Sequence, residues 1–142
     1  MSQTNISRTA GFEEVEHTAD WAYRIWGQNV EELFTQAAIG LYTLAGVELA
    51  DKPNLVREIE LKGIDRESLL VAWLNELLYL HESENLAFSE FEFLQLDSQN
   101  LRMRMRGAST RQWHKYIKAI TYNNLAIIQS DRGWEATLVM DV

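Results

Sequence analysis

Oxygen-bearing side chains at two separate points of the chain could bind a cation. Residues 16–20 read Glu-His-Thr-Ala-Asp, the densest polar cluster next to an expected strand, and Asp20 there could act as a metal ligand or a general base. Asp141 stands one residue before the C-terminus, where the terminal carboxylate of Val142 adds further oxygens. Hard cations such as calcium prefer carboxylate and carbonyl oxygens. Capping of local backbone groups and a solvated chain end would explain the same residues, so both interpretations stay open.

A basic stretch occupies the last third of the chain. Residues 98–130 contain no acidic side chain, and aromatic residues stand among the arginines and lysines. Such a stretch could stack on nucleic-acid bases and hold phosphates, or it could meet an acidic surface on a partner or on this chain. A solvated strand face would also explain arginines that stand two residues apart. Our candidates for a contact with a partner or RNA are Arg102, Arg104 and Arg106.

Lys118 differs from the other basic residues because it stands among apolar, β-branched neighbours. A lysine in such a strand usually extends its ammonium group to the surface or pairs with a carboxylate. Asp20 and Asp141 are the candidate partners for such a pair.

The composition excludes several other kinds of site. The chain has no cysteine, which rules out disulfides, thiolate zinc sites, iron–sulfur clusters and a cysteine nucleophile. It also has no glycine-rich phosphate loop and no His-Glu-x-x-His motif, and its three histidines lie far apart. No apolar run approaches the roughly 20 residues that cross a bilayer, and the N-terminus lacks the apolar segment of a secretory signal. We therefore expect a cytoplasmic protein with no membrane partner.

The chain has 142 residues, a length that suits one domain. Charge is distributed unevenly along it. The formal net charge is −8, with −12 on residues 1–97 and +4 on residues 98–142. An acidic chain is a poor non-specific binder of nucleic acid, because phosphates repel it. The uneven distribution is a hint of a specific interaction.

Hydrophobic patterning predicts alternating strands and helices, and then only strands. A strand over 15–28 precedes a helix that Asn29 caps and Gly46 ends, and a strand over 55–62 precedes an apolar helix that Asp65 caps. The strands expected after that cover 88–96 with a bulge near Phe93, 101–106, 116–128 as one strand or two, and 134–142 after a turn at 131–133. We therefore expect a single two-layer α+β domain over 12–142, with a mostly antiparallel sheet, two main helices packed on one face, and a flexible N-terminal leader over 1–11.

Five segments, in this order, resemble the archease family. They are 16–20 (EHTAD), 30–38 (VEELFTQAA), 65–78 (DRESLLVAWLNELL), 117–122 (IKAITY) and 139–142 (VMDV). The resemblance extends from about residue 12 to the end of the chain.

The resemblance implies an accessory protein and not an enzyme that acts by itself. Archeases assist the RtcB-type RNA ligase of tRNA splicing and RNA repair, by promoting its GTP-dependent guanylylation and its multiple turnover. The resemblance also implies calcium or another divalent ion bound by Asp20, Asp141 and the main-chain oxygen of Val142, and it associates Lys118 with activation, together with the two aspartates. The implied partners are the ligase and, indirectly, tRNA or other RNA. We expect a monomer or a weak homo-oligomer.

Two positions depart from the family pattern, and two other functions stay open. Asn123 stands where many archeases carry a histidine, and Trp21 stands beside Asp20 where smaller residues are common. One alternative function is a chaperone-like adaptor for RNA-processing proteins that acts through its basic face without a metal. The other is a metal-dependent hydrolase with His17 as the base, although the chain lacks the histidine ligands of an open catalytic metal site.

Overall fold

The computed structural model describes residues 4–5, 9–16 and 21–142, which form two helices and ten short or medium strands. In chain order these are β1 (Thr4–Asn5), β2 (Gly11–Glu16), β3 (Trp21–Gly27), α1 (Val30–Ala45), β4 (Val47–Leu49), β5 (Leu55–Lys62), α2 (Arg66–Glu84), β6 (Leu86–Leu96), β7 (Asn100–Trp113), β8 (Ala119–Thr121), β9 (Ile128–Ser130) and β10 (Gly133–Asp141).

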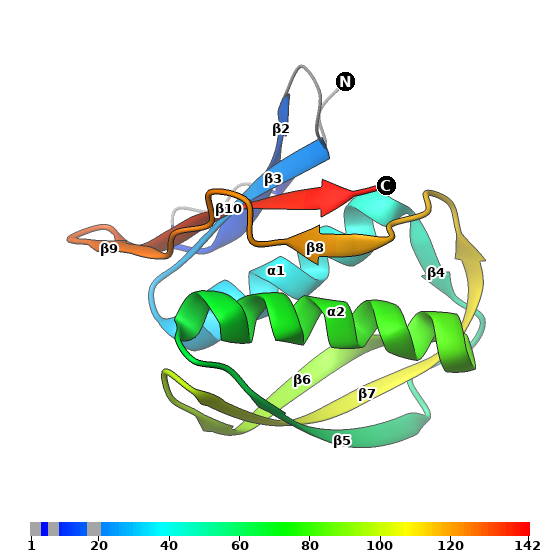
Figure 1. The fold of residues 1–142 in the computed structure, drawn as a ribbon. Coiled ribbons are helices and arrows are strands. Elements are labelled where there is room, and N and C mark those ends of the chain that lie inside the picture. Colours follow the sequence, from blue (N-terminus) through cyan, green and yellow to red (C-terminus); the bar gives the residue numbers. More distant parts are fainter. Residues whose placement is uncertain (1–3, 6–8, 17–20) are drawn as a thin grey trace.

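The two helices lie side by side between two antiparallel sheets (Figure 1). One sheet has the order β1-β2-β3-β10-β8, with β9 paired to the first residues of β10. In the other, β7 is central, β6 pairs along one side of it, and β5 and β4 pair with successive parts of its other side. α1 contacts β2 and β3 of the first sheet and β6 of the second, and α2 contacts β8 as well as β5, β6 and β7.

The predicted α+β class and the antiparallel pairing are confirmed, and the layers differ from the expectation. The expected single sheet is two sheets, so the helices are covered on two sides and not packed on one face. The physical reason lies in α2, where consecutive residues are buried, among them the Leu69–Leu70 and Trp73–Leu74 pairs. Consecutive residues of an α-helix point about 100° apart around its axis. A helix that buries both members of such pairs therefore needs apolar neighbours on more than one side.

Both predicted helix starts are confirmed by their caps. The Asn29 side-chain oxygen accepts the backbone N–H of Glu32 at 2.8 Å, and the Glu32 carboxylate accepts the backbone N–H of Gln28 at 2.7 Å. In α2, Asp65 accepts the Ser68 N–H at 2.8 Å, and the Ser68 hydroxyl accepts the Asp65 N–H at 3.1 Å. These bonds satisfy backbone donors that the first turn of a helix leaves unpaired.

The strand predicted over 116–128 is wrong for most of its length. Within that range only β8 and Ile128, the first residue of β9, are in strands, and a turn follows Tyr122, whose carbonyl accepts the N–H of Leu125 at 2.9 Å. Leu125 and Ile127 pack against the core from this connection without belonging to a strand. Apolar, β-branched composition therefore identified burial at Ile117 and Ile120, but Tyr116, Tyr122 and Ile128 are exposed, and the composition could not show that the segment lacks a continuous partner strand.

The strands predicted over 55–62, 88–96, 101–106 and 134–142 are confirmed. The single strand predicted over 15–28 is wrong, because Val15 and Glu16 belong to β2, which pairs antiparallel with β3. The pairing of β6 with β7 shifts register between Phe93 and Gln95, where the phase of the sequence changes. Part of the expected leader, Thr4 and Asn5, pairs with β2, and most of the remaining leader lies outside the described residues. No helix in the described part of the chain is long and apolar enough to cross a membrane.

Candidate functional site

Three strands bring two of the predicted site residues together at one end of the six-stranded sheet. Trp21, the first residue of β3, pairs with Met140, and Ala119, the first residue of β8, pairs with Asp141. The backbone N–H of Lys118 donates to the backbone carbonyl of Asp141 at 2.8 Å. Lys118 and Asp141 are therefore neighbours in space, because antiparallel pairing of β8 with β10 places the start of one strand beside the end of the other. We call this end of the sheet, formed by Lys118, Asp141 and Val142, the C-terminal end site.

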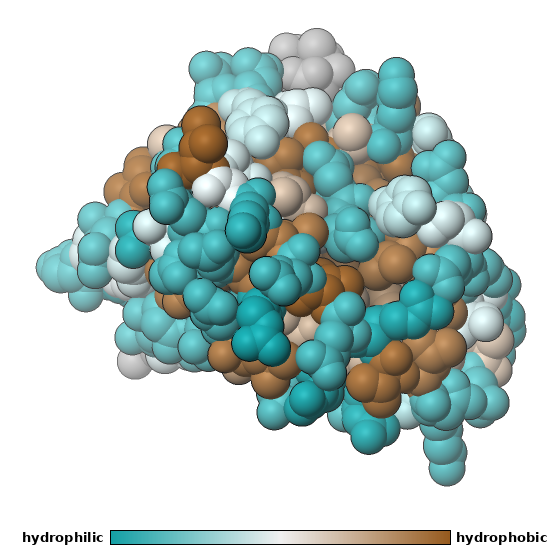
Figure 2. Space-filling view, turned by 60° about the horizontal axis from the view of Figure 1, so that its bottom comes forward, coloured by the Kyte–Doolittle hydropathy of each residue, from teal (hydrophilic) through white to brown (hydrophobic). Residues whose placement is uncertain are grey.

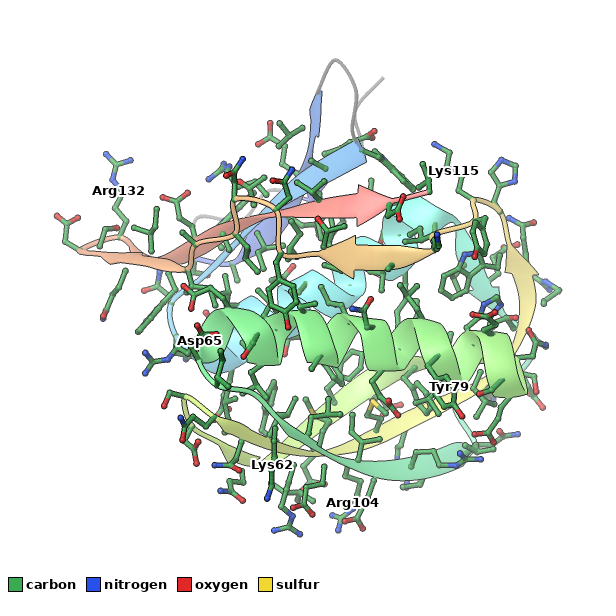
Figure 3. The ribbon with its side chains drawn as sticks, in the orientation of Figure 1. Lys62, Asp65, Tyr79, Arg104, Lys115 and Arg132 are labelled. Atoms are coloured by element: carbon green, nitrogen blue, oxygen red, sulfur yellow. The ribbon has the colours of Figure 1, made fainter. Side chains whose placement is uncertain are left out.

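The side chains of the C-terminal end site are accessible. Lys118 and Asp141 are both exposed, and Val142 keeps 65% of its surface in solvent. A further positive charge lies close by, since the Lys115 ammonium group stands 5.1 Å from the centre of the Trp21 ring (Figure 3). An exposed pair of opposite charges on fixed backbone can meet a partner without any change of fold.

The chemical type of the donors at this end of the sheet, carboxylate and carbonyl oxygens, suits a hard cation. Within the described residues they include the Asp141 carboxylate and the main-chain oxygen of Val142, while the Asp141 carbonyl already accepts a hydrogen bond from Lys118. Calcium takes about six to eight oxygens, so further donors would have to complete its shell. The described part of the chain holds no cluster of three or more histidine, aspartate or glutamate side chains arranged for a metal. Asp20 and His17, which the sequence singled out, lie outside the described residues.

The three candidate arginines lie on the other sheet, away from the C-terminal end site. Arg102, Arg104 and Arg106 point outward from β7, and Arg104 projects from the outer face of its sheet (Figure 3). Arg104 donates to Glu92 at 3.0 Å and stands 3.4 Å from Glu58, so glutamates of both neighbouring strands surround it.

The rest of that face continues the same mixture of charges. Arg102 pairs in register with Glu60, and Arg106 with Glu90. Hydrophilic side chains cover most of the surface that Figure 2 shows, with separate apolar patches between them. The basic ladder of the sequence is thus largely matched by the acidic residues of the chain's own first part.

Replacing Arg104 with alanine is expected to change stability only slightly. Both of its ion pairs are exposed, and exposed pairs contribute about 0–1 kcal/mol each. Urea denaturation should show a loss of at most about 2 kcal/mol in the free energy of unfolding, the sum of the two pairs, and added salt should shrink this loss because salt screens exposed charges. Arg102→Ala is the matched control on the same strand. A loss of several kcal/mol, independent of salt, would contradict this prediction.

A hollow of about 360 Å³ lies beside the C-terminal end site, between the last turns of α2 and the segment after β7. Its walls include His81, Trp113, Tyr116 and Ile117. The His81 ring stacks on the Trp113 ring with 3.9 Å between their centres, and burial lowers the pKa of His81 below its ordinary value. A larger hollow of about 850 Å³ lies at the start of α2, against the turn after β8.

Sequence reasoning missed Asn75, which α2 presents to β8. Its side-chain oxygen accepts the backbone N–H of Ile120 at 2.9 Å, and its side-chain nitrogen donates to the carbonyl of Ile120 at 3.3 Å. The signal in the sequence is weak: a polar amide, next to Glu76, within a mostly apolar stretch of helix.

Comparison with known proteins gives a consistent result. The model of the Archease protein family matches residues 12–142. Protein archease of Methanopyrus kandleri is 34% identical over 139 residues, which cover 92% of this chain and 99% of that protein. Protein archease of Saccharolobus islandicus is 37% identical over 136 residues, covering 92% of this chain and 98% of that protein.

Two solved structures are also similar. The crystal structure of a Thermotoga maritima archease, described as a possible chaperone, superposes with a TM-score of 0.67 at 26% identity and covers 90% of this chain and 94% of that one. The solution structure of protein 1598 of Methanobacterium thermoautotrophicum gives a TM-score of 0.68 at 28% identity, covering 92% of this chain and 98% of that one. Family model, sequence relatives and fold agree over nearly the whole length: the chain belongs to the archease family.

Proposed function

We propose that this protein is an accessory protein that activates an RtcB-type, GTP-dependent RNA ligase in tRNA splicing and RNA repair, by promoting ligase guanylylation and multiple turnover. Membership of the archease family supports this proposal. The structural observation that supports it is the backbone hydrogen bond that joins Lys118 to Asp141, both with exposed side chains, at one end of the sheet. These two residues come from separate elements, and the fold makes them neighbours.

The geometry suits a group that reaches into a partner's active site. The backbones of β8 and β10 fix the backbone of Lys118 and Asp141, so only their side chains need ordering when a partner binds. The Lys118 ammonium group could hold a phosphate oxygen of GTP, and the accessible carboxylates could orient a cationic group of the ligase.

A divalent ion would be held by Asp20, Asp141 and the main-chain oxygen of Val142. Calcium is the ion we propose, because every one of these donors is an oxygen. When bound, such an ion supplies positive charge that can neutralise phosphate oxygens. The role of the protein's own Lys118 and Asp141 is to present an ammonium group and a carboxylate at one exposed end of the sheet.

The test is a guanylylation assay with labelled GTP and the RtcB-type ligase of the same source, with this protein at sub-stoichiometric amounts. The native protein is expected to increase the rate, and Asp141→Ala is expected to abolish the increase while leaving the circular dichroism spectrum unchanged. Asp131→Ala is the matched control, because Asp131 is an exposed aspartate in the turn at the opposite end of β10. Equal activation by the native protein and Asp141→Ala would overturn the assignment of the site.

A chaperone-like adaptor that acts through the basic face is the second candidate. It draws on the arginine ladder, and it predicts that Arg102→Glu and Arg106→Glu impair the protein more than Asp141→Ala does. The ion pairs of Arg104 with Glu58 and Glu92 count against this candidate, because they already neutralise the centre of the ladder. The same guanylylation assay separates the two candidates.

A further inference from the structure

The outermost strand of the six-stranded sheet is held at its outer edge by a helix side chain. β8 pairs with β10 on one side, and no strand of the described chain pairs with its other side. Asn75 occupies that position. Its amide makes the two hydrogen bonds with Ile120 that a neighbouring strand would make, at 2.9 Å to the N–H and 3.3 Å to the carbonyl.

An asparagine is suited to this task for a chemical reason. Its side-chain amide has a donor and an acceptor in the arrangement of a peptide group, so one side chain can satisfy both backbone groups of one residue. An aspartate could accept the N–H but could not donate to the carbonyl, and a leucine could do neither. Ile120 is only 3% exposed, so an unpaired N–H or carbonyl at this residue would carry a desolvation cost.

The helix that presents Asn75 is itself firmly anchored. Trp73 and Leu74, the two residues before it, are fully buried in the core. The same helix also binds the connection after β8, since the Glu67 carboxylate accepts the N–H of Ile127 at 3.0 Å. α2 therefore fixes both ends of the segment between Ile120 and Ile127, which has no continuous strand partner.

We propose that Asn75 is a positioning residue for activation of the ligase: by binding Ile120 it keeps β8 in register with β10, so that Lys118 stays beside Asp141. The proposal rests on the function proposed above. β8 has only three residues and few ladder hydrogen bonds of its own, and Lys118 precedes it directly. Short edge strands of this kind open locally at low cost, so two added hydrogen bonds have a large influence on where Lys118 lies.

Asn75→Leu tests the proposal because leucine has a similar size and makes neither hydrogen bond. Hydrogen exchange measured by NMR should become roughly tenfold faster at the amides of Ile120 and Lys118, the factor that one ordinary hydrogen bond is worth. Amides of β7, in the other sheet, should keep their exchange rates. Asn75→Asp retains the acceptor and should give an intermediate result, which keeps the test valid if the leucine variant folds poorly.

Guanylylation provides the second readout. A misplaced Lys118 should lower the maximal rate at saturating protein about tenfold, while the concentration that gives half-maximal activation stays within about twofold. Loss of folded protein would instead raise that concentration and leave the maximal rate intact. Asn54→Leu is the matched control, since it makes the same replacement at an exposed residue before β5 and should change neither value.

Two results would overturn the proposal. One is faster exchange throughout the chain together with a shifted half-maximal concentration, which would show a general role in stability. The other is faster local exchange with an unchanged maximal rate, which would show that the position of Lys118 does not matter. Failure of the proposed function looks different, because the native protein, with Asn75 intact, would then not raise the guanylylation rate at all.

Discussion

Replacing Trp73 with alanine is expected to lower the free energy of unfolding by about 3–5 kcal/mol, the range for loss of a large aromatic side chain from a core. Trp73 is fully buried on α2, and its ring meets the Phe91 ring edge to face, with 5.6 Å between the centres. Its indole N–H also donates to the backbone carbonyl of Phe34 in α1 at 2.9 Å. The substitution therefore opens a cavity between the helices and one sheet, and it removes the hydrogen bond that the indole adds to a helix carbonyl.

Urea denaturation followed by far-ultraviolet circular dichroism measures this loss without relying on tryptophan fluorescence. Trp73→Phe keeps an aromatic ring in the core and removes the N–H with the rest of the five-membered ring, so it should cost clearly less than alanine. Tyr79→Ala removes an aromatic side chain from the same helix at a position that is 61% exposed, and it should cost about 0.5 kcal/mol or less. An alanine variant at position 73 that is as stable as the Tyr79 variant would contradict the placement of Trp73 in the core.

Local signals predicted the helices well because capping depends on a few neighbouring residues. Asn29 and Asp65 are both preferred N-cap residues, and each accepts the expected backbone N–H. Gly46 adopts a φ of 70° after α1, a left-handed conformation that glycine enters at little cost. These features are decided within a span of four or five residues, so the sequence shows them directly.

The layers and the segment after β8 could not be predicted in the same way. Hydrophobic periodicity shows which faces of an element are buried, but not which element covers them. The apolar positions of α2 are therefore compatible with one sheet or with two. The bonds from Glu67 to Ile127 and from Asn75 to Ile120 replace strand pairing in the segment after β8, and long-range contacts of this kind leave no local pattern.

The candidate site was predictable in part. Asp141 was a candidate partner of Lys118, and the structure makes them neighbours through a backbone hydrogen bond. The arginine ladder was also identified, but only the register of β7 with β5 and β6 shows that glutamates flank it. Residue types and spacing therefore found the charges, and strand pairing decided which of them meet.

Replacing Lys118 with glutamate is expected to reduce activation of the ligase about tenfold or more at saturating protein, with little effect on stability. The side chain is exposed, and the hydrogen bond to Asp141 uses only its backbone N–H, so the fold should tolerate the change. The new carboxylate would stand beside Asp141 and repel phosphate oxygens that a lysine attracts, a reversal worth at least about 1.4 kcal/mol. Labelled GTP and the guanylylation assay measure this loss.

Calcium binding by the same variant should not fall with activation. An added carboxylate beside Asp141 supplies another oxygen donor and removes a positive charge, and both changes favour a cation. Calorimetric titration should therefore show calcium binding that is equal or tighter in Lys118→Glu, while activation falls.

Lys118→Arg should retain activation in large part, and Lys62→Glu, an exposed residue at the end of β5 in the other sheet, should change neither property. If activation and calcium binding were lost together, the lysine would act by shaping the metal site; if activation were unchanged, Lys118 would have no part in it. A split between the two measurements would mean that the lysine acts on the ligase or its nucleotide directly, at a point that the chain end holds in place.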